Sequence, residues 1–132
     1  MRYFLIMNPG SGGEKSREKF KQILAFFNKN KLDFDYKLTD TLEDAYHLSV
    51  EANKNGDEVI IAVGGDGTIN RVINGFYDPL GRRISGSKLA VIHTGTSPDF
   101  CKSYNIPLEV DRALNTAIIA STVIRSLIRA RI

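Results

Sequence analysis

Five consecutive apolar residues in the middle of the chain limit its fold more than any other segment. Residues 59–63 read Val-Ile-Ile-Ala-Val, with no polar side chain on either face of an extended strand. A strand with one face in water alternates polar and apolar residues, whereas a strand of a parallel sheet is covered on both faces and reads as a continuous apolar run. The segment therefore predicts a buried strand in a sheet that carries helices on both sides.

The remainder of the chain alternates between strand-like and helix-like segments. In the helical segments apolar residues recur at spacings of three and four, as on the buried face of an amphipathic helix. The expected strands cover residues 3–7, 34–38, 59–63 and 89–92, and the expected helices cover about 14–30, 42–55, 68–76 and 111–120. The second strand alternates polar and apolar residues and should have one wetter face. This order predicts an α/β fold: an open, mostly parallel sheet with helices on both faces.

The ends of the second helix carry clear local signals. Thr41 followed by Asp44 has the spacing of a capping box, in which a hydroxyl and a carboxyl group satisfy two backbone N–H groups at a helix start. Asn55-Gly56 closes the segment, and glycine is common just beyond a helix C-terminus. These signals predict a helix that begins at Leu42 and ends at Asn55.

Length and composition indicate one ordinary globular domain. The chain has 132 residues, of which 42% are hydrophobic and 25% are charged. We assign residues 1–121 to one α/β domain and residues 122–132 to a tail. The tail fits either an extension of the last helix or the first strand of a second domain, because its β-branched residues weakly favour extended structure.

Charge and cysteine content limit the classes of binding partner and the cellular compartment that fit this chain. The net charge of +3 is small and scattered, so it does not indicate a nucleic-acid partner, which usually meets a clustered basic face. The single cysteine, Cys101, fits a reducing compartment. The first apolar run, of about five residues, is too short for a signal peptide or a membrane span. We expect a cytoplasmic protein with at most peripheral membrane contact, and the apolar tail could support a homodimer.

Polar loops that contain glycine follow three of the expected strands. They cover residues 8–13, 64–68 and 94–99. The carboxyl ends of parallel strands lie at one edge of a sheet, and ligands of open α/β folds bind at that edge. These loops should therefore meet at one site although they lie far apart in the sequence.

The central loop, Gly64-Gly65-Asp66-Gly67-Thr68, has the chemistry of an anion site. Glycine allows positive φ and a close approach to a ligand, and backbone N–H groups ahead of a helix attract phosphate. Thr68 can cap the helix or donate its hydroxyl to a phosphate. Asp66 would repel phosphate, so it indicates Mg²⁺ or a proton-accepting role. The alternative is a tight turn with Asp66 as the N-cap; the sequence contains neither a Walker loop nor a dinucleotide fingerprint.

Three motifs together resemble a known family. Asn8-Pro9-x-Ser11-Gly12, the central loop followed by x-Asn70, and Gly95-Thr96-x-x-Asp99-Phe100 have the order and spacing of the diacylglycerol kinase catalytic domain. Sphingosine kinases, ceramide kinases and bacterial lipid kinases share this domain, and its fold is related to that of NAD kinases and phosphofructokinases. The resemblance covers residues 1 to about 107.

The resemblance implies an enzyme that uses ATP and Mg²⁺ to phosphorylate a hydroxyl of diacylglycerol or a similar lipid. It implies Asp66 as the catalytic residue and Asp66 with Asp99 as the acidic pair around Mg²⁺. The nucleotide-binding residues that it implies are Asn8, Pro9, Gly10, Ser11, Gly12, Thr39, Gly64, Gly65, Gly67, Thr68, Asn70 and Thr96. His93, at the end of the fourth strand, is expected to be structural rather than catalytic.

Three departures from the family pattern bear on activity. Pro98 stands where the family usually has asparagine, and it offers no N–H. Arg71 stands where the family usually has glutamate, and it could bring a cation toward phosphates or face solvent. Family members also continue into a second, β-rich domain. We expect that domain to be missing here, because the chain stops at Ile132 and has no acidic residue after Asp111.

These departures lead us to expect nucleotide binding with little or no phosphoryl transfer. Phosphoryl transfer depends on positioning both substrates, and one half of a cleft positions only one of them. Two alternatives stay open: an NAD-kinase-like enzyme, and a non-catalytic nucleotide-binding or regulatory module.

Overall fold

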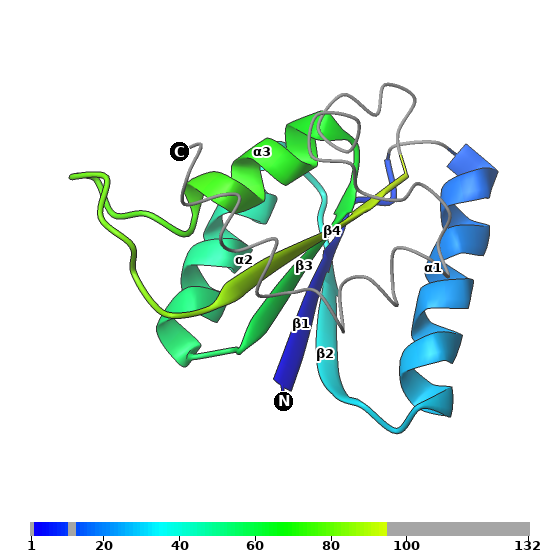
Figure 1. Ribbon diagram of the computed structural model, residues 1–132. Coiled ribbons are helices and arrows are strands. Elements are labelled where there is room, and N and C mark those ends of the chain that lie inside the picture. The colour runs from blue at the N-terminus through cyan, green and yellow to red at the C-terminus, as the bar shows by residue number, and fades with distance from the viewer. Residues whose placement is uncertain (1, 11–12, 95–132) are drawn as a thin grey trace.

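The computed structural model describes residues 2–10 and 13–94 of the chain, and for residues 13–15 the backbone alone. These residues form a four-stranded parallel sheet with the strand order β2-β1-β3-β4 (Figure 1). The strands are β1 (Arg2–Met7), β2 (Asp33–Leu38), β3 (Val59–Gly64) and β4 (Lys88–His93), and the helices are α1 (Gly13–Lys29), α2 (Leu42–Asn55) and α3 (Asp66–Asn74). The expected parallel α/β sheet is confirmed. The helix expected at 111–120 and the tail at 122–132 lie outside the described residues.

Helices cover both faces of the sheet. Figure 1 views the sheet nearly edge-on, with α1 on one side and with α2 and α3 together on the other. Strand β3 is buried along its whole length, and β1 is buried from Tyr3 to Met7. The run at 59–63 is therefore apolar for the reason that its pattern predicts: helices cover both faces of the sheet.

Aromatic side chains fix α1 to the sheet. Phe27 is completely buried, and its ring packs edge-on against Tyr3 of β1 with a centroid distance of 5.4 Å. The same ring packs against Phe34 of β2 at 5.1 Å. Phe20 and Ile23, which precede Phe27 at spacings of seven and four residues, are buried on the same side of the helix. Burial of these large side chains is the main stabilising contribution of α1.

Strand β2 is the edge of the described sheet, and both of its faces are wetter than expected. Phe34 is half-buried against α1, but Tyr36 and Leu38, on the same face of the strand, are 40% and 56% exposed. Asp35 and Lys37 on the other face are exposed as well. The alternating pattern predicted one dry face. It is driest at Phe34, which packs against Phe27 of α1.

The order of the strands creates a topological switch point between β1 and β3. From β1 the chain crosses to β2 on one side, whereas from β3 it crosses to β4 on the other. The segments that leave the carboxyl ends of β1 and β3 therefore separate toward opposite faces of the sheet, to α1 and α3 (Figure 1). Ligands of open α/β sheets bind at such a point of reversal.

Both ends of α2 have the predicted caps. Thr41 Oγ1 accepts a hydrogen bond from the Asp44 N–H at 3.2 Å, and Asp44 Oδ2 accepts one from the Thr41 N–H at 2.9 Å. The backbone N–H of Asp40 also donates to Asp44, and these bonds to the carboxylate lower the pKa of Asp44. Gly56 ends the helix with φ of 79°, a left-handed conformation that glycine adopts without strain.

Replacing Thr41 with alanine should lower the free energy of unfolding by about 1 kcal/mol, because the N-cap oxygen is lost. Thr41→Ser keeps that oxygen and is the control. Folding lowers the pKa of Asp44 below its ordinary 3.8, so the stabilisation from this carboxylate is complete above pH 3.8 and is lost as the pH falls through the lowered pKa. Urea unfolding at neutral and acidic pH measures both effects. A Thr41→Ala chain as stable as the serine variant would contradict the role of the cap.

Candidate functional site

The loops that follow the strands gather at the carboxyl edge of the sheet, as the sequence predicts. Backbone hydrogen bonds continue the sheet pairing one residue beyond the strands: the Asn8 N–H donates to Val63 O, and the Thr39 N–H donates to Met7 O, both at 2.9 Å. The Thr94 N–H donates to Gly64 O at the same distance. The sequence-predicted residues that the structure brings to this edge are Asn8, Pro9, Gly10, Thr39, Gly64, Gly65, Asp66, Gly67 and Thr68. Ser11, Gly12, Thr96 and Asp99 lie outside the described residues.

Asn8 ties the loop after β1 to the first turn of α3. Its Nδ2 donates a hydrogen bond to Thr68 Oγ1 at 2.9 Å, across the switch point between β1 and β3. Its Oδ1 accepts a bond from the Gly10 N–H, also at 2.9 Å, which shapes the loop itself. A single amide side chain therefore fixes two segments that lie 60 residues apart. Thr68 is 1% exposed and Asn8 is half-buried, so this bond is partly shielded from water.

The turn after β3 has a different geometry from the one that its glycines suggest. Helix α3 begins at Asp66, two residues earlier than expected, and Gly65 is the N-cap with φ of −86°. The interpretation of Asp66 as the N-cap is therefore wrong. Among the described residues the glycines with positive φ are Gly56 and Gly81, so the turn does not use the left-handed freedom of glycine.

Packing explains why residue 64 is glycine. A Cβ at Gly64 would lie 2.8 Å from both the Cβ and the Oγ1 of Thr68, closer than non-bonded carbon atoms approach one another. The missing side chain lets the first turn of α3 rest directly on the end of β3. This contact sets the distance between the sheet edge and the helix N-terminus.

The N-terminus of α3 is suited to an anion. The first N–H groups of a helix have no partner within the helix, and their dipoles favour negative charge. The N-cap, Gly65, has no side chain to satisfy one of them, and α3 has no side-chain cap. The first helical backbone bond runs from the Ile69 N–H to Gly65 O at 3.0 Å. Phosphate oxygens could supply the acceptors that a serine or aspartate supplies at other helix starts.

Asp66 lies at the first position of α3 and contacts a histidine. Its Oδ1 is 3.1 Å from Nε2 of His93, which is the last residue of β4. The side chain of His93 is 2% exposed, whereas that of Asp66 is 35% exposed. The sequence places His93 at the end of a strand but does not pair it with Asp66, because the pairing depends on which strand lies beside β3.

Metal ligation by Asp66 would have to involve groups beyond the described residues. Within residues 2–10 and 13–94 no three His, Cys, Asp or Glu side chains come together as a metal site. The expected partner, Asp99, falls in the undescribed part of the chain. Mg²⁺ commonly uses one or two carboxylates together with substrate phosphates, so a single carboxylate at a helix start suited to an anion is compatible with it.

The other predicted residues have different degrees of exposure. Thr39 is 3% exposed, and its Oγ1 lies 3.4 Å from Met7 O, so its hydroxyl is part of the strand-end packing. Gly67 and Asn70 are exposed, and Asn70 follows Asp66 by one helical turn on the same side of α3. Leu42, which sequence reasoning missed, lies beside Gly67: a Cβ there would be 3.6 Å from Leu42 Cδ2.

Arg71 is engaged with the neighbouring helix. Its Nη1 lies 3.1 Å from Glu43 Oε1 in the first turn of α2, and both side chains are substantially exposed. An exposed pair of this kind contributes between about 0 and 1 kcal/mol to stability. The guanidinium group of Arg71 is therefore accommodated at the surface beside α2, not in a buried space.

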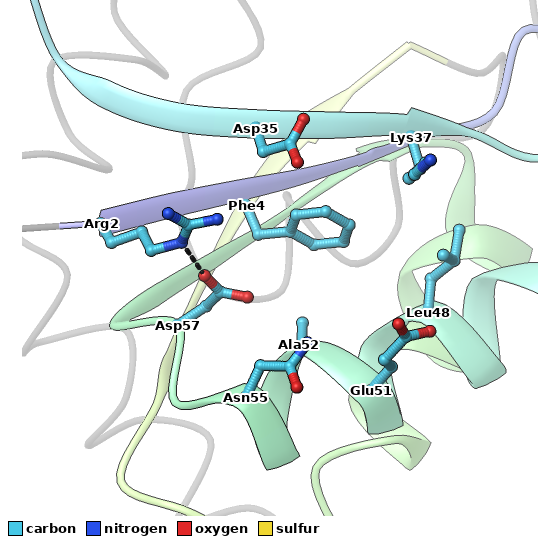
Figure 2. A pocket seen from close by; sticks show the side chains of 9 residues that line it. All are labelled: Arg2, Phe4, Asp35, Lys37, Leu48, Glu51, Ala52, Asn55 and Asp57. Atoms are coloured by element: carbon cyan, nitrogen blue, oxygen red, sulfur yellow. Dashed lines mark hydrogen bonds and ion pairs between the residues drawn. The ribbon is translucent and has the colours of Figure 1, made fainter.

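The pocket in Figure 2 is separate from this edge. It has a volume of about 150 Å³ and lies between the α2 side of the sheet and α2 itself, close to the start of β1. Figure 2 shows Phe4 between the charged residues Arg2, Asp35 and Glu51. Arg2 Nε donates to Asp57 Oδ1 at 2.7 Å, and this hydrogen bond raises the pKa of Arg2. Acidic and basic side chains lie next to one another in the pocket, so its charge favours neither an anion nor a cation.

None of the helices in the described part of the chain is both long and apolar enough to cross a membrane. A family model, the diacylglycerol kinase catalytic domain, matches residues 2–128. The chain is 38% identical over 115 residues to a diacylglycerol kinase of Bacillus subtilis and 33% identical over 114 residues to one of Staphylococcus aureus.

These relatives are longer than the chain. The matched segment covers 86% of this chain in both cases, but only 37% of the B. subtilis protein and 35% of the S. aureus protein. A crystal structure of a diacylglycerol kinase from Bacillus anthracis matches with a TM-score of 0.65 at 29% identity, over 85% of this chain and 39% of that one. The chain belongs to the diacylglycerol kinase catalytic domain family.

Proposed function

We propose that this chain is the nucleotide-binding part of an ATP-dependent lipid kinase, which phosphorylates a hydroxyl of diacylglycerol or a similar lipid. The observation that carries the proposal is the Asn8–Thr68 hydrogen bond across the switch point. It joins two of the three family motifs into one surface, at the place where open α/β sheets bind ligands. Family membership supports the kinase assignment, and the names of the relatives support a lipid acceptor.

ATP fits the chemistry of this edge through its phosphate groups. The start of α3, which has no side-chain cap, offers N–H donors at Gly65 and Gly67, with Thr68 holding the turn in place. The loop of Asn8, Pro9 and Gly10 lies on the other side of the switch point. We assign the remaining nucleotide contacts to Ser11, Gly12, Thr39, Asn70 and Thr96. In the transfer, the acceptor oxygen bonds to the terminal phosphorus as the bond to the ADP oxygen breaks, and the acceptor's proton passes to a base.

We assign the metal role to Asp66, with Asp99 as its partner. The Asp66 carboxylate stands at a helix start that attracts phosphate, so it needs a cation between itself and the nucleotide. Mg²⁺ bound there would neutralise the charge that develops on the phosphates. Asp66 is therefore the residue of the described chain that we propose for catalysis.

We also propose that the 132-residue chain binds ATP but transfers its phosphate slowly. The chain spans about a third of the length of the curated relatives it matches. Positioning of the second substrate can contribute roughly 7–11 kcal/mol to the lowering of a barrier. The proposed setting is the cytoplasm, with peripheral contact to the membrane that holds the lipid, and self-association into a homodimer. No nucleic-acid partner is proposed.

Calorimetric titration of the chain with ATP, with and without Mg²⁺, tests the binding proposal. We expect saturable binding that Mg²⁺ strengthens. Incubation with labelled ATP and either diacylglycerol micelles or NAD, followed by thin-layer separation, identifies the acceptor. A labelled NAD product would favour the NAD-kinase alternative, and the absence of ATP binding would favour the non-catalytic regulatory module. Rapid lipid phosphorylation by this chain would contradict the proposal that it is slow.

A further inference from the structure

A buried histidine holds the one proposed metal-binding carboxylate among the described residues. His93 ends β4, and its backbone is paired in register with Gly64 at the end of β3. Its Nε2 lies 3.1 Å from Asp66 Oδ1. The side chain of His93 is 2% exposed and that of Asp66 is 35% exposed. The contact therefore links a buried residue at the end of β4 to a partly exposed residue at the start of α3.

We propose that His93 is a positioning residue for Asp66: it fixes the orientation of the carboxylate that meets the Mg²⁺–nucleotide complex. The inference rests on the function proposed above. It assigns to a residue outside the three motifs a role in metal-dependent binding, and it replaces our expectation that His93 is merely structural.

The direction of the hydrogen bond follows from the chemistry of the two groups. An ionised carboxylate has no hydrogen to donate, so Nε2 must carry the proton and donate it to Oδ1. The imidazole itself has little freedom, because it is packed at the end of a strand of the buried sheet. A rigid donor thus restricts rotation of the carboxylate about its Cβ–Cγ bond, and this restriction also determines where Oδ2 lies.

A metal-binding carboxylate that is already held in one orientation loses less conformational entropy when the metal binds. Outer partners that orient metal ligands typically contribute about 10–100-fold to metal affinity. A merely structural histidine would behave differently: its loss would lower the stability of the chain and would weaken ATP binding equally with and without Mg²⁺. The two roles can therefore be separated by measuring binding under both conditions.

The experiment compares three substitutions at position 93. Glutamine can place an amide N–H near the position of Nε2, asparagine can reach only near Nδ1, and leucine has no donor. For each variant, calorimetry gives the affinity for ATP with and without Mg²⁺, and urea unfolding gives the stability. We expect His93→Leu and His93→Asn to weaken ATP binding about tenfold in Mg²⁺ and less than about twofold without it. His93→Gln should restore binding in Mg²⁺ to within about threefold of the native chain.

A second comparison makes the test specific to the pair. In an Asp66→Asn background, His93→Leu should cause no further loss of Mg²⁺-dependent binding, because the group that it positions is gone. A long-range ¹⁵N NMR spectrum should also show a protonated Nε2 in the native chain and a changed Nε2 resonance in Asp66→Asn.

The outcomes distinguish this inference from the proposed function. Equal losses with and without Mg²⁺, failure of glutamine to restore binding, or a full effect of His93→Leu in the Asp66→Asn background would overturn the role of His93 alone. If the native chain does not bind ATP at all, the proposed function fails, and the inference fails with it.

Discussion

Replacing Gly64 with alanine is expected to lower the free energy of unfolding by about 1–3 kcal/mol and to weaken ATP binding at least about tenfold. The added Cβ would lie 2.8 Å from two atoms of Thr68, so the first turn of α3 must move away from the end of β3. That movement displaces the helix start and stretches the bond between Thr68 and Asn8, which is 2.9 Å long. Urea unfolding measures the first effect, and calorimetric titration with ATP measures the second.

Gly67→Ala, in the same turn, is the matched control for stability. A Cβ at Gly67 would make ordinary contacts with Leu42 at 3.6 and 3.7 Å, and alanine is the better helix former by up to about 1 kcal/mol. We therefore expect Gly67→Ala to be as stable as the native chain or more so. Combining Gly64→Ala with Thr68→Gly removes the colliding atoms, and the stability losses should then be smaller than additive. Additive losses would show that the collision is not the cause.

Replacing Asp66 with asparagine should weaken ATP binding in the presence of Mg²⁺ but not in its absence. In Mg²⁺ we expect ATP binding to weaken by roughly tenfold or more. Loss of a metal ligand should lower the affinity at least as much as loss of a residue that only orients the ligand. Without the metal we expect binding to be unchanged or tighter, because a negative charge next to the phosphates has been removed. Titrations with ATP alone and with ATP plus Mg²⁺ measure the two effects.

Asp40→Asn is the control for this substitution. Asp40 is an exposed carboxylate between β2 and α2, near the same edge of the sheet, and it has no proposed role in binding. The change in net charge is the same, so a general electrostatic effect would appear in both variants. If Asp66→Asn retains the full Mg²⁺ dependence of the native chain, Asp66 is not a metal ligand.

Local signals in the sequence were sufficient to predict the main elements of the described fold. The apolar run at 59–63 requires cover on two faces, and the capping box of Thr41 and Asp44 is formed by neighbours in the chain. The exposure of Tyr36 and Leu38 could not be predicted in this way. It depends on β2 lying at the edge of the described sheet, and this position is not encoded within the strand itself.

The site was predictable in location but not in its contacts. Strand ends and glycine loops indicated the carboxyl edge, and the loops of Asn8 and Gly64 do meet there. The reason for Gly64 could not be read from its sequence neighbours, because the collision arises only when α3 folds back on β3. The His93–Asp66 pair depends in the same way on β4 lying next to β3.

The close contact between Thr68 and Gly64 has a consequence for how this motif changes during evolution. In a descendant that no longer uses nucleotides but keeps Thr68, glycine at position 64 would still be the more stable choice, so selection for stability alone would favour it. Position 66 is under no such packing constraint, because the Asp66 side chain is partly exposed at the start of α3. Among such descendants, substitutions should therefore appear first at Asp66. Among related sequences, glycine at position 64 would then indicate only that the fold is kept, whereas aspartate at position 66 would indicate that the proposed metal-dependent function is kept.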